Sequence, residues 1–153
     1  MKKITPFLWF DNNAEEAVSF YLSIFKNSRI KSLLRYGKGG PMPEGTVLTV
    51  SFEIEGRDYV ALNGGPMYQF TPAFSLSVEC ENQEEIDYYW EKLTEGGKPI
   101  QCGWLEDKYG LSWQVVPHNI SDLLMTKDPA KNQRVMDAML KMIKLDIKAL
   151  EEA

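Results

Sequence analysis

The side chains that most often carry catalysis are few in this sequence and are not grouped. His118 is the single histidine, so a histidine-rich metal site and a second imidazole base are both excluded. Cys80 and Cys102 lack CxxC spacing, which is typical of small buried hydrophobic residues in a reducing compartment. No GxSxG or Cys–His arrangement is present. The sequence therefore defines no catalytic residue, and whether the chain is an enzyme stays open.

Charged side chains and glycine-rich turns give only weak candidates for chemistry. Residues 106–109, Glu-Asp-Lys-Tyr, lie at an expected turn, where contact with solvent is the simpler interpretation. Glu53 and Glu79 alternate with apolar neighbours, so each fits either a pocket-facing carboxylate or an exposed one. The glycines of residues 37–40 and 64–65 lead into proline-containing loops and not into helices. This pattern disfavours a nucleotide-type site for S-adenosylmethionine.

The composition is that of an ordinary globular protein. The chain has 153 residues, is 44% hydrophobic and carries a formal net charge of −5, enough for one domain or two small modules. The acidic balance disfavours nucleic-acid binding, because no general excess of Lys and Arg is present. No apolar run reaches the length of about 18 residues that a bilayer span needs. The N-terminal residues show no signal-peptide pattern, so we expect a cytoplasmic protein without membrane contact.

Hydrophobic periodicity predicts alternating strands and helices, followed by a helical tail. The expected strands are residues 5–10, 29–36, 46–54, 59–63, 74–79, 100–102, 104–106 and 111–116. The expected helices are residues 14–25, 81–94, 121–126, 129–142 and 147–152. Asp128 followed by Pro129 is a typical helix start. The tail begins after Pro117, where the strand pattern ends.

The halves of this pattern repeat with a shift of 69 residues. The matching pairs are Asn13 and Asn82, Glu15 and Glu84, Glu16 and Glu85, Phe20 and Tyr89, Tyr21 and Trp90, and Ile24 and Leu93. Each set gives a helix cap, an acidic first turn and an apolar stripe in the same order. A strand precedes each helix and three strands follow it, so the sequence indicates a duplicated βαβββ unit.

Several long segments resemble one family in particular. They are residues 4–10, 64–66, 70–73, 83–87, 101–114 and 134–142. With the duplicated unit, these segments are similar to the PhnB-like branch of the vicinal oxygen chelate superfamily, which includes glyoxalase I and extradiol dioxygenases. Some members of this branch carry the label 3-demethylubiquinone-9 3-methyltransferase. The similarity extends over nearly the whole chain.

The resemblance implies an α+β fold in which two βαβββ modules form curled mixed sheets around a pocket, with helices outside. We expect a duplicated domain over residues 1–117, with modules at about 3–63 and 73–117. Residues 118–153 are expected to form a C-terminal helical extension.

Family enzymes hold a divalent metal on His, Glu or Gln side chains from the first and last strand of each module. The corresponding positions here carry Thr5, Asn63, Phe74 and Gln114. Phe74 cannot bind a metal, and the other three are neutral donors that do not offset the desolvation of a divalent ion. We therefore expect no bound metal and no cofactor.

The same positions suggest an apolar, aromatic lining for the pocket. Strand alternation places Phe7 and Trp9 on the face of Thr5, and Tyr59 on the face of Asn63. The full set of candidate ligand-binding residues is Thr5, Phe7, Trp9, Tyr59, Asn63, Phe74, Trp104 and Gln114. Such a lining suits a small, apolar or planar organic molecule, although the aromatic residues could equally fill a core.

Three functional interpretations remain open. The chain could bind a small molecule in a metal-free pocket, or it could be an enzyme of the superfamily whose metal ligands lie at other positions. It could also be chiefly an assembly module, with a homodimer formed through exposed strands or the methionine-rich tail. A homodimer is compatible with either of the first two interpretations. Methyl transfer, as in the family label, is disfavoured by the glycine-rich segments described above.

Overall fold

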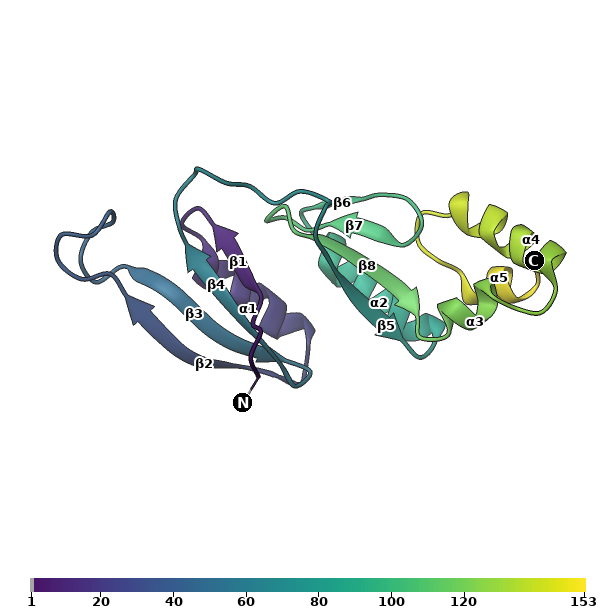
Figure 1. Cartoon of the computed structure of the whole chain (residues 1–153), viewed down its shortest axis with the longest axis horizontal. Coiled ribbons are helices and arrows are strands. Elements are labelled where there is room, and N and C mark those ends of the chain that lie inside the picture. Colours follow the sequence, from purple (N-terminus) through teal and green to yellow (C-terminus); the bar gives the residue numbers. More distant parts are fainter. Residues whose placement is uncertain (1) are drawn as a thin grey trace. The chain divides into compact units, whose positions relative to one another are not determined.

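The chain folds into two compact units that divide between Gln69 and Phe70. The computed structural model describes residues 2–153, and Figure 1 follows the chain through its elements. The first unit contains β1 (Phe7–Phe10), α1 (Ala14–Ile24), β2 (Ser28–Arg35), β3 (Val47–Ile54) and β4 (Arg57–Asn63). Its four strands form one sheet in the order β1-β4-β3-β2. Strand β1 is parallel to β4, and the two other pairings are antiparallel.

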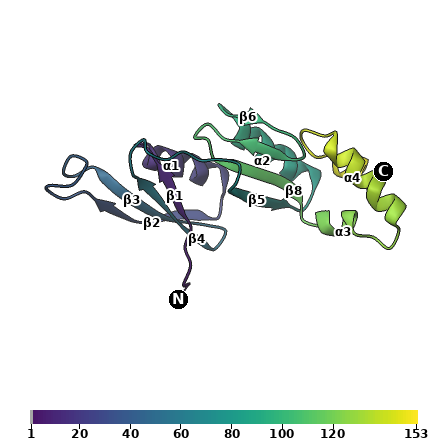
Figure 2. The ribbon, with the colours of Figure 1, turned by 45° about the horizontal axis from the view of Figure 1, so that its top comes forward.

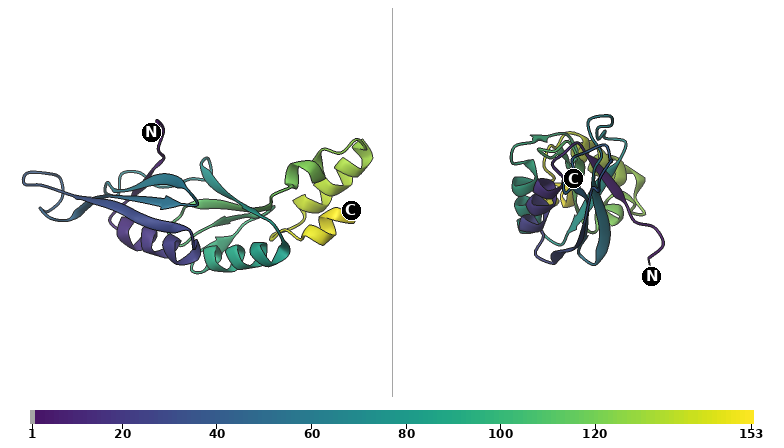
Figure 3. Two further views of the ribbon diagram at one scale, coloured as in Figure 1. Left: turned by 90° about the horizontal axis from the view of Figure 1, so that it is seen from below. Right: turned by 90° about the vertical axis from the view of Figure 1, so that its left-hand side faces the viewer.

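One face of the first sheet forms the core with α1, which runs along that side (Figure 3, left). Cross-strand partners face the same side, so the register of Leu8 with Ala61 and of Ala61 with Val50 defines this face. All three are fully buried against the apolar stripe of α1. The helix presents Ala17, Val18 and Tyr21 at helical spacing, as the sequence pattern predicts.

The second unit repeats this arrangement and adds a helical tail. It contains β5 (Ser75–Cys80), α2 (Gln83–Thr94), β6 (Lys98–Pro99), β7 (Trp104–Glu106), β8 (Ser112–Pro117), α3 (Ile120–Leu124), α4 (Pro129–Leu140) and α5 (Ile147–Glu151). The sheet order is β5-β8-β7-β6, with β5 parallel to β8. The α+β fold of two βαβββ modules with C-terminal helices, which the resemblance implies, is confirmed.

The number of residues that separates corresponding positions of the two units differs by one between the strands and the helices. At the helix N-caps, Asn13 and Asn82, the shift is 69, as in the sequence alignment. In the strands the backbone bond from Gly64 N–H to Phe10 O has its counterpart in the bond from His118 N–H to Cys80 O. Phe10 therefore corresponds to Cys80, a shift of 70. This difference of one residue changes the face of the sheet that each side chain of β5 is assigned to, because side chains alternate between faces along a strand.

The expected strand at residues 100–102 is wrong in position. Strand β6 contains only Lys98 and Pro99, and the following residues form the turn into β7. Cys102 and Gly103 both adopt positive φ, of 59° and 82°, which no regular strand permits. The bond from Trp104 N–H to Gln101 O closes this turn.

The tail returns to the second sheet and is fastened to it. The backbone N–H groups of Cys102 and Gly103 donate to the carbonyls of Met142 and Ile143, at 2.9 and 2.8 Å. The Gln83 side chain donates to Leu145 O and accepts from Ile147 N–H. These bonds satisfy the backbone of a segment that carries no helix.

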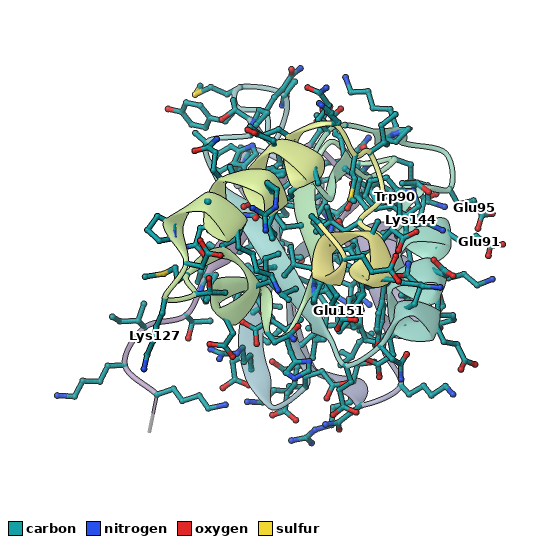
Figure 4. All side chains as sticks on the ribbon, turned by 90° about the vertical axis from the view of Figure 1, so that its right-hand side faces the viewer. Trp90, Glu91, Glu95, Lys127, Lys144 and Glu151 are labelled. Carbon is teal, nitrogen blue, oxygen red and sulfur yellow. The ribbon has the colours of Figure 1, made fainter. Side chains whose placement is uncertain are left out.

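Ionic and apolar contacts hold the same segment. Lys144, labelled in Figure 4, forms a 2.6 Å ion pair with Asp87 on α2. The hydrogen bond from Lys144 lowers the pKa of the Asp87 carboxyl below its usual value. Leu145 and Leu150 are fully buried with Val135 of α4. Figure 2 shows the helical segment, in yellow and green, beyond the end of β8. By its contacts, the tail is part of the second unit.

No helix among the described residues, 2–153, has the length and apolar character that crossing a membrane requires.

Gly103 is a position where a single methyl group is expected to disturb the packing of the tail on the second unit. A Cβ there would lie 2.8 Å from Val115 O and 3.0 Å from Leu145 Cγ, in addition to the positive φ. We expect Gly103→Ala to lower the free energy of unfolding by about 2–4 kcal/mol, measured by chemical denaturation.

Gly110→Ala is the matched control, because Gly110 has a φ of 88° but nothing within 4 Å of an added Cβ. The control reports backbone strain alone and should cost about 1 kcal/mol. Equal losses in the two variants would show that the tail does not pack closely on this turn.

Candidate functional site

The face of the first sheet opposite α1 carries apolar side chains, and no helix among the described residues of the first unit, 2–69, covers it. Phe7 pairs with Val60 and Trp9 pairs with Leu62, so these four residues point to the same side. Val60 and Leu62 are half-buried, whereas Phe7 is 62% exposed. We call these four residues the aromatic face. Sequence alternation predicts the placement of Phe7 and Trp9 on one side, and the structure brings them together.

Trp9 is held in one orientation by the segment that follows β4. Its indole Nε1–H donates to Gly65 O at 2.9 Å. Tyr68 and the indole form a T-shaped pair, with ring centroids 5.0 Å apart and an interplanar angle of 79°. A Cβ on Gly64 would lie 2.4 Å from two indole carbons, so the ring packs directly against the Gly64 backbone. The indole is thus fixed from three directions.

Hydroxyl groups lie next to these aromatic residues on the same face. Ser51 pairs with Val60, and Thr49 pairs with Leu62. Both are half-buried residues of β3. A molecule lying on the aromatic face would therefore meet ring surfaces first and hydrogen-bonding hydroxyls one strand further on.

The structure separates Asn63 from this face. Asn63 is paired with Phe10 on the α1 side of the sheet and is 6% exposed. Its Oδ1 accepts from Ala14 N–H at 2.9 Å, and its Nδ2 donates to Val47 O at 3.0 Å. The expectation that Asn63 shares a pocket face with Phe7 and Trp9 is wrong, because the register places it one residue out of phase with them. Asn63 instead caps the first turn of α1.

Tyr59 also lies on the α1 side of the sheet. It pairs with Phe52, and the two rings stack with centroids 5.4 Å apart. Burial raises the pKa of the Tyr59 phenol above its usual value. The expected grouping of Tyr59 with Asn63 is therefore found, but on the helix side and not on the aromatic face. Thr5 is half-buried and precedes β1.

The second sheet has a more polar open face. Gln114 pairs with Ser77 and with Trp104, so the three share one side. The Gln114 amide donates to the Ser75 hydroxyl at 3.0 Å. Gln114 and Trp104 are half-buried. Leu76 and Trp113 point to the opposite side, where Trp113 is buried with α2.

Phe74 is not part of this polar group. It precedes β5, is 47% exposed and has the parity of Leu76, which faces α2. The shift of 70 in the strands makes Ser75, and not Phe74, the counterpart of Thr5. Phe74, which the family resemblance assigned, lies 69 residues after Thr5 and so follows the helix shift and not the strand shift. The alternation of Ser75 and Ser77 with Leu76 and Val78 is the signal that could have corrected it.

These positions do not fit a divalent metal ion. Both polar atoms of the Asn63 side chain are engaged in hydrogen bonds beneath α1. Phe74 offers no donor atom, and Gln114 is a single neutral ligand. Among residues 2–153, no group of three or more His, Cys, Asp or Glu side chains is arranged to hold a metal.

The acidic and thiol groups of the sequence have structural surroundings. Asp107 is 2% exposed and accepts from Tyr109 N–H, Leu111 N–H and Trp113 Nε1–H, so it fixes the turn before β8. The expectation of a solvated turn there is wrong for Asp107. Burial raises the pKa of the Cys80 thiol to about 12, which makes it a poor nucleophile.

Two residues that contact the aromatic face were outside the set of candidate residues predicted from the sequence. Tyr68 and Gly64 contact Trp9, but they lie in a loop with no periodicity to place them. The signal was compositional: Met67, Tyr68 and Phe70 are unusually bulky for a solvated loop.

Comparison with known proteins gives the family. The profile of the 3-demethylubiquinone-9 3-methyltransferase family matches residues 2–116. A PhnB protein from Bacillus cereus, described as a putative 3-demethylubiquinone-9 3-methyltransferase, is 41% identical, with a TM-score of 0.68. That similarity covers 75% of this chain and 99% of the other. The chain therefore belongs to this family, which is the PhnB-like one that its sequence resembles.

More distant structures share the fold alone. A protein from Pseudomonas aeruginosa is 20% identical with a TM-score of 0.63, covering 76% of this chain and 98% of its own. The fosfomycin resistance protein FosX from Listeria monocytogenes, in complex with Mn(II) and sulfate, is 13% identical with a TM-score of 0.53. It covers 88% of this chain and 98% of its own. No functionally curated protein matches the chain.

We expect Gly64→Ala to displace the Trp9 indole, because the added methyl group would overlap the ring. The Trp9 Nε1–H bond to Gly65 O should weaken, and its indole cross-peak in a ¹H–¹⁵N correlation spectrum should shift. A Trp9→Phe spectrum assigns that peak among the four tryptophans.

Gly37→Ala is the matched control, since nothing lies within 4 Å of an added Cβ there. An unshifted Trp9 peak in Gly64→Ala would contradict the close packing of the indole on this backbone.

Proposed function

We propose that this protein binds a small, largely apolar or aromatic organic molecule on the aromatic face of the first sheet. The observation that carries the proposal is the fixed orientation of Trp9 beside an exposed Phe7. An aromatic side chain held before binding loses little conformational freedom when a ligand stacks on it. The neighbouring hydroxyls of Thr49 and Ser51 supply a small number of directional hydrogen bonds.

The exposure of Phe7 supports the same interpretation. A phenylalanine 62% exposed on a sheet face leaves apolar area in contact with water. Its neighbours Trp9, Val60 and Leu62 extend this area across β1 and β4. Patches of this type mark binding surfaces more often than isolated exposed residues do.

A metal-assisted reaction, as the Mn(II) in the Listeria FosX structure suggests for that protein, is the second candidate. The likeness to FosX concerns the fold, and the donor positions described above do not supply a ligand set for a divalent ion. We therefore propose binding without a protein-held metal. Methyl transfer has only the family name in its favour. The glycine-rich segment after β4 packs on Trp9, which speaks against its use as a cofactor-binding loop.

The proposed binding of an apolar or aromatic molecule is tested by a thermal-shift screen of neutral aromatic and aliphatic metabolites. We expect compounds with a planar ring to raise the Tm of the wild-type chain, because binding to the folded state stabilises it. Phe7→Ala should weaken binding of such a compound about tenfold, the loss expected for one stacking contact.

Ile4→Ala is the matched control, because Ile4 is 89% exposed and precedes the aromatic face. Equal affinities of wild type and Phe7→Ala would exclude this face as the binding site. Gln114→Ala tests separately whether the open face of the second sheet contributes, since Gln114 belongs to the other unit.

The absence of a protein-held metal is tested on the purified chain. We expect elemental analysis to find far less than one zinc, nickel, manganese or iron per chain, because no described group of side chains offers a charged ligand set. Dialysis against Mn(II) followed by the same measurement controls for loss during purification. About one tightly held metal per chain would refute the proposal of metal-free binding and favour the second candidate.

A further inference from the structure

The side of the first sheet that carries the aromatic face continues across all four strands. Residues that pair across strands point to the same side, and the pairing defines two rows on this side. The first row is Trp9, Leu62, Thr49 and Leu34, and the second is Phe7, Val60, Ser51 and Ser32. In both rows the apolar residues of β1 and β4 are followed by a hydroxyl group on β3.

A group of charged side chains lies beside the second row. Its members, which we call the charged cluster, are Asp58, Glu53, Lys31, Arg29 and Lys2. Asp58 lies two residues before Val60 on β4 and therefore shares its side. Glu53 pairs with Asp58, and Arg29 pairs with Glu53. Lys31 Nζ donates to Asp58 Oδ1 at 3.0 Å, and Lys2 Nζ lies 3.8 Å from Asp58 Oδ2.

The cations are the accessible members of the charged cluster. The side chains of Asp58 and Glu53 are 23% and 24% exposed, whereas those of Arg29 and Lys2 are 67% and 56% exposed. The hydrogen bond from Lys31, together with the charge of Lys2, lowers the pKa of the Asp58 carboxyl below its usual value. With three cations and two carboxylates, the cluster has a formal charge of +1 on a chain whose net charge is −5.

Stability is a weak reason for this arrangement. Ion pairs between exposed side chains contribute little to the free energy of folding, because water and salt screen them. The closest contact of Arg29 with Glu53 is 3.5 Å, which is longer than the distance of about 2.8 Å in a well-formed charge-assisted hydrogen bond. These cations can therefore turn toward a bound anion at a small cost.

We infer that the ligand of the aromatic face carries an anionic group of the carboxylate class, which binds to the cations of the charged cluster. This inference rests on the proposed function, because the apolar part of the same ligand lies on Phe7 and Trp9. Lys31 and Lys2 meet at Asp58, two residues along β4 from Val60, which is a distance of about 7 Å. A carboxylate joined to an aromatic ring by a short chain spans this distance.

The arrangement of the charges favours an anionic ligand over a cationic one. A ligand ammonium group would have to displace Lys31 from Asp58 within a group that has more cations than carboxylates. A ligand carboxylate accepts hydrogen bonds from the exposed ammonium and guanidinium groups without breaking the hydrogen bond between Lys31 and Asp58. The charged cluster thus selects the sign of the ligand, and the aromatic face selects its shape.

Three probes that differ in one group test the inference on the full chain. They are 3-phenylpropionate, 3-phenylpropan-1-ol and 3-phenylpropylamine, each titrated while the Trp9 indole cross-peak is followed. At low ionic strength we expect the acid to bind about fivefold more tightly than the alcohol, and the amine more weakly than both. About 0.5 M NaCl should remove most of the advantage of the acid and leave the alcohol unchanged.

Lys31→Gln should weaken binding of the acid about threefold and leave that of the alcohol unchanged, because one cation is lost. Lys26→Gln is the matched control, since it removes the same charge from an exposed lysine that follows α1. Equal Tm values of the two variants establish that both remain folded. Equal losses of acid affinity in the two variants would show that only the net charge of the chain matters, and would overturn the inference.

The probes separate failure of this inference from failure of the proposed function. Equal affinities of the acid and the alcohol in the wild-type chain, or tightest binding of the amine, would overturn the inference alone. An acid that binds equally to wild type and to Phe7→Ala would overturn the proposed function, because the ring would then lie elsewhere. An unchanged Trp9 peak with all three probes at about 10 mM would overturn both.

Discussion

Each sheet of this protein is covered by a helix on one face, and this constraint decides what every strand residue can do. Because faces alternate, a residue that packs on α1 or α2 is unavailable to a ligand on the other side. The buried positions Leu8, Val50 and Ala61 fix the phase of the first sheet. Phe7 and Trp9 follow as members of the open face.

The same constraint explains which parts of the site the sequence could predict. The fold class, the duplication and the positions of most elements follow from hydrophobic periodicity and from the repeated cap and helix pattern. The placement of Phe7 and Trp9 follows from alternation within β1. The placement of Asn63 does not, because it depends on the register between β1 and β4, which is a non-local property. Its hydrogen bonds to Ala14 and Val47 are visible only once the strands are paired.

Phe74 shows a second limit of sequence reasoning. A shift of 69 aligns the helices, whereas the strands require 70. A difference of one residue is unimportant for a helix stripe, which is broad, but it exchanges the two faces of a strand. The error therefore affected the second module, where it placed Phe74 in the polar group that contains Ser75 and Gln114.

Duplication has left the two units with different open faces. Trp9, Phe7, Val60 and Leu62 make the first face apolar, while Ser75, Ser77 and Gln114 make the second polar. The first has a tryptophan fixed by a glycine and a tyrosine of the following segment. The open face of the first unit can thus offer stacking surfaces that the second unit does not repeat. This difference is the reason for proposing that the ligand binds on the first sheet.

The corresponding outer strands have diverged in the same way. Strand β2 has eight residues, whereas its counterpart β6 has two. In the second unit, the chain after β6 turns early, and the N–H groups of Cys102 and Gly103 bond to the tail at Met142 and Ile143. The backbone there is satisfied within the unit. The first unit has no tail segment of its own, and its outer strand keeps eight residues. A duplicated sheet has two such outer strands, and in this chain the C-terminal segment bonds to the turn that follows the shorter one.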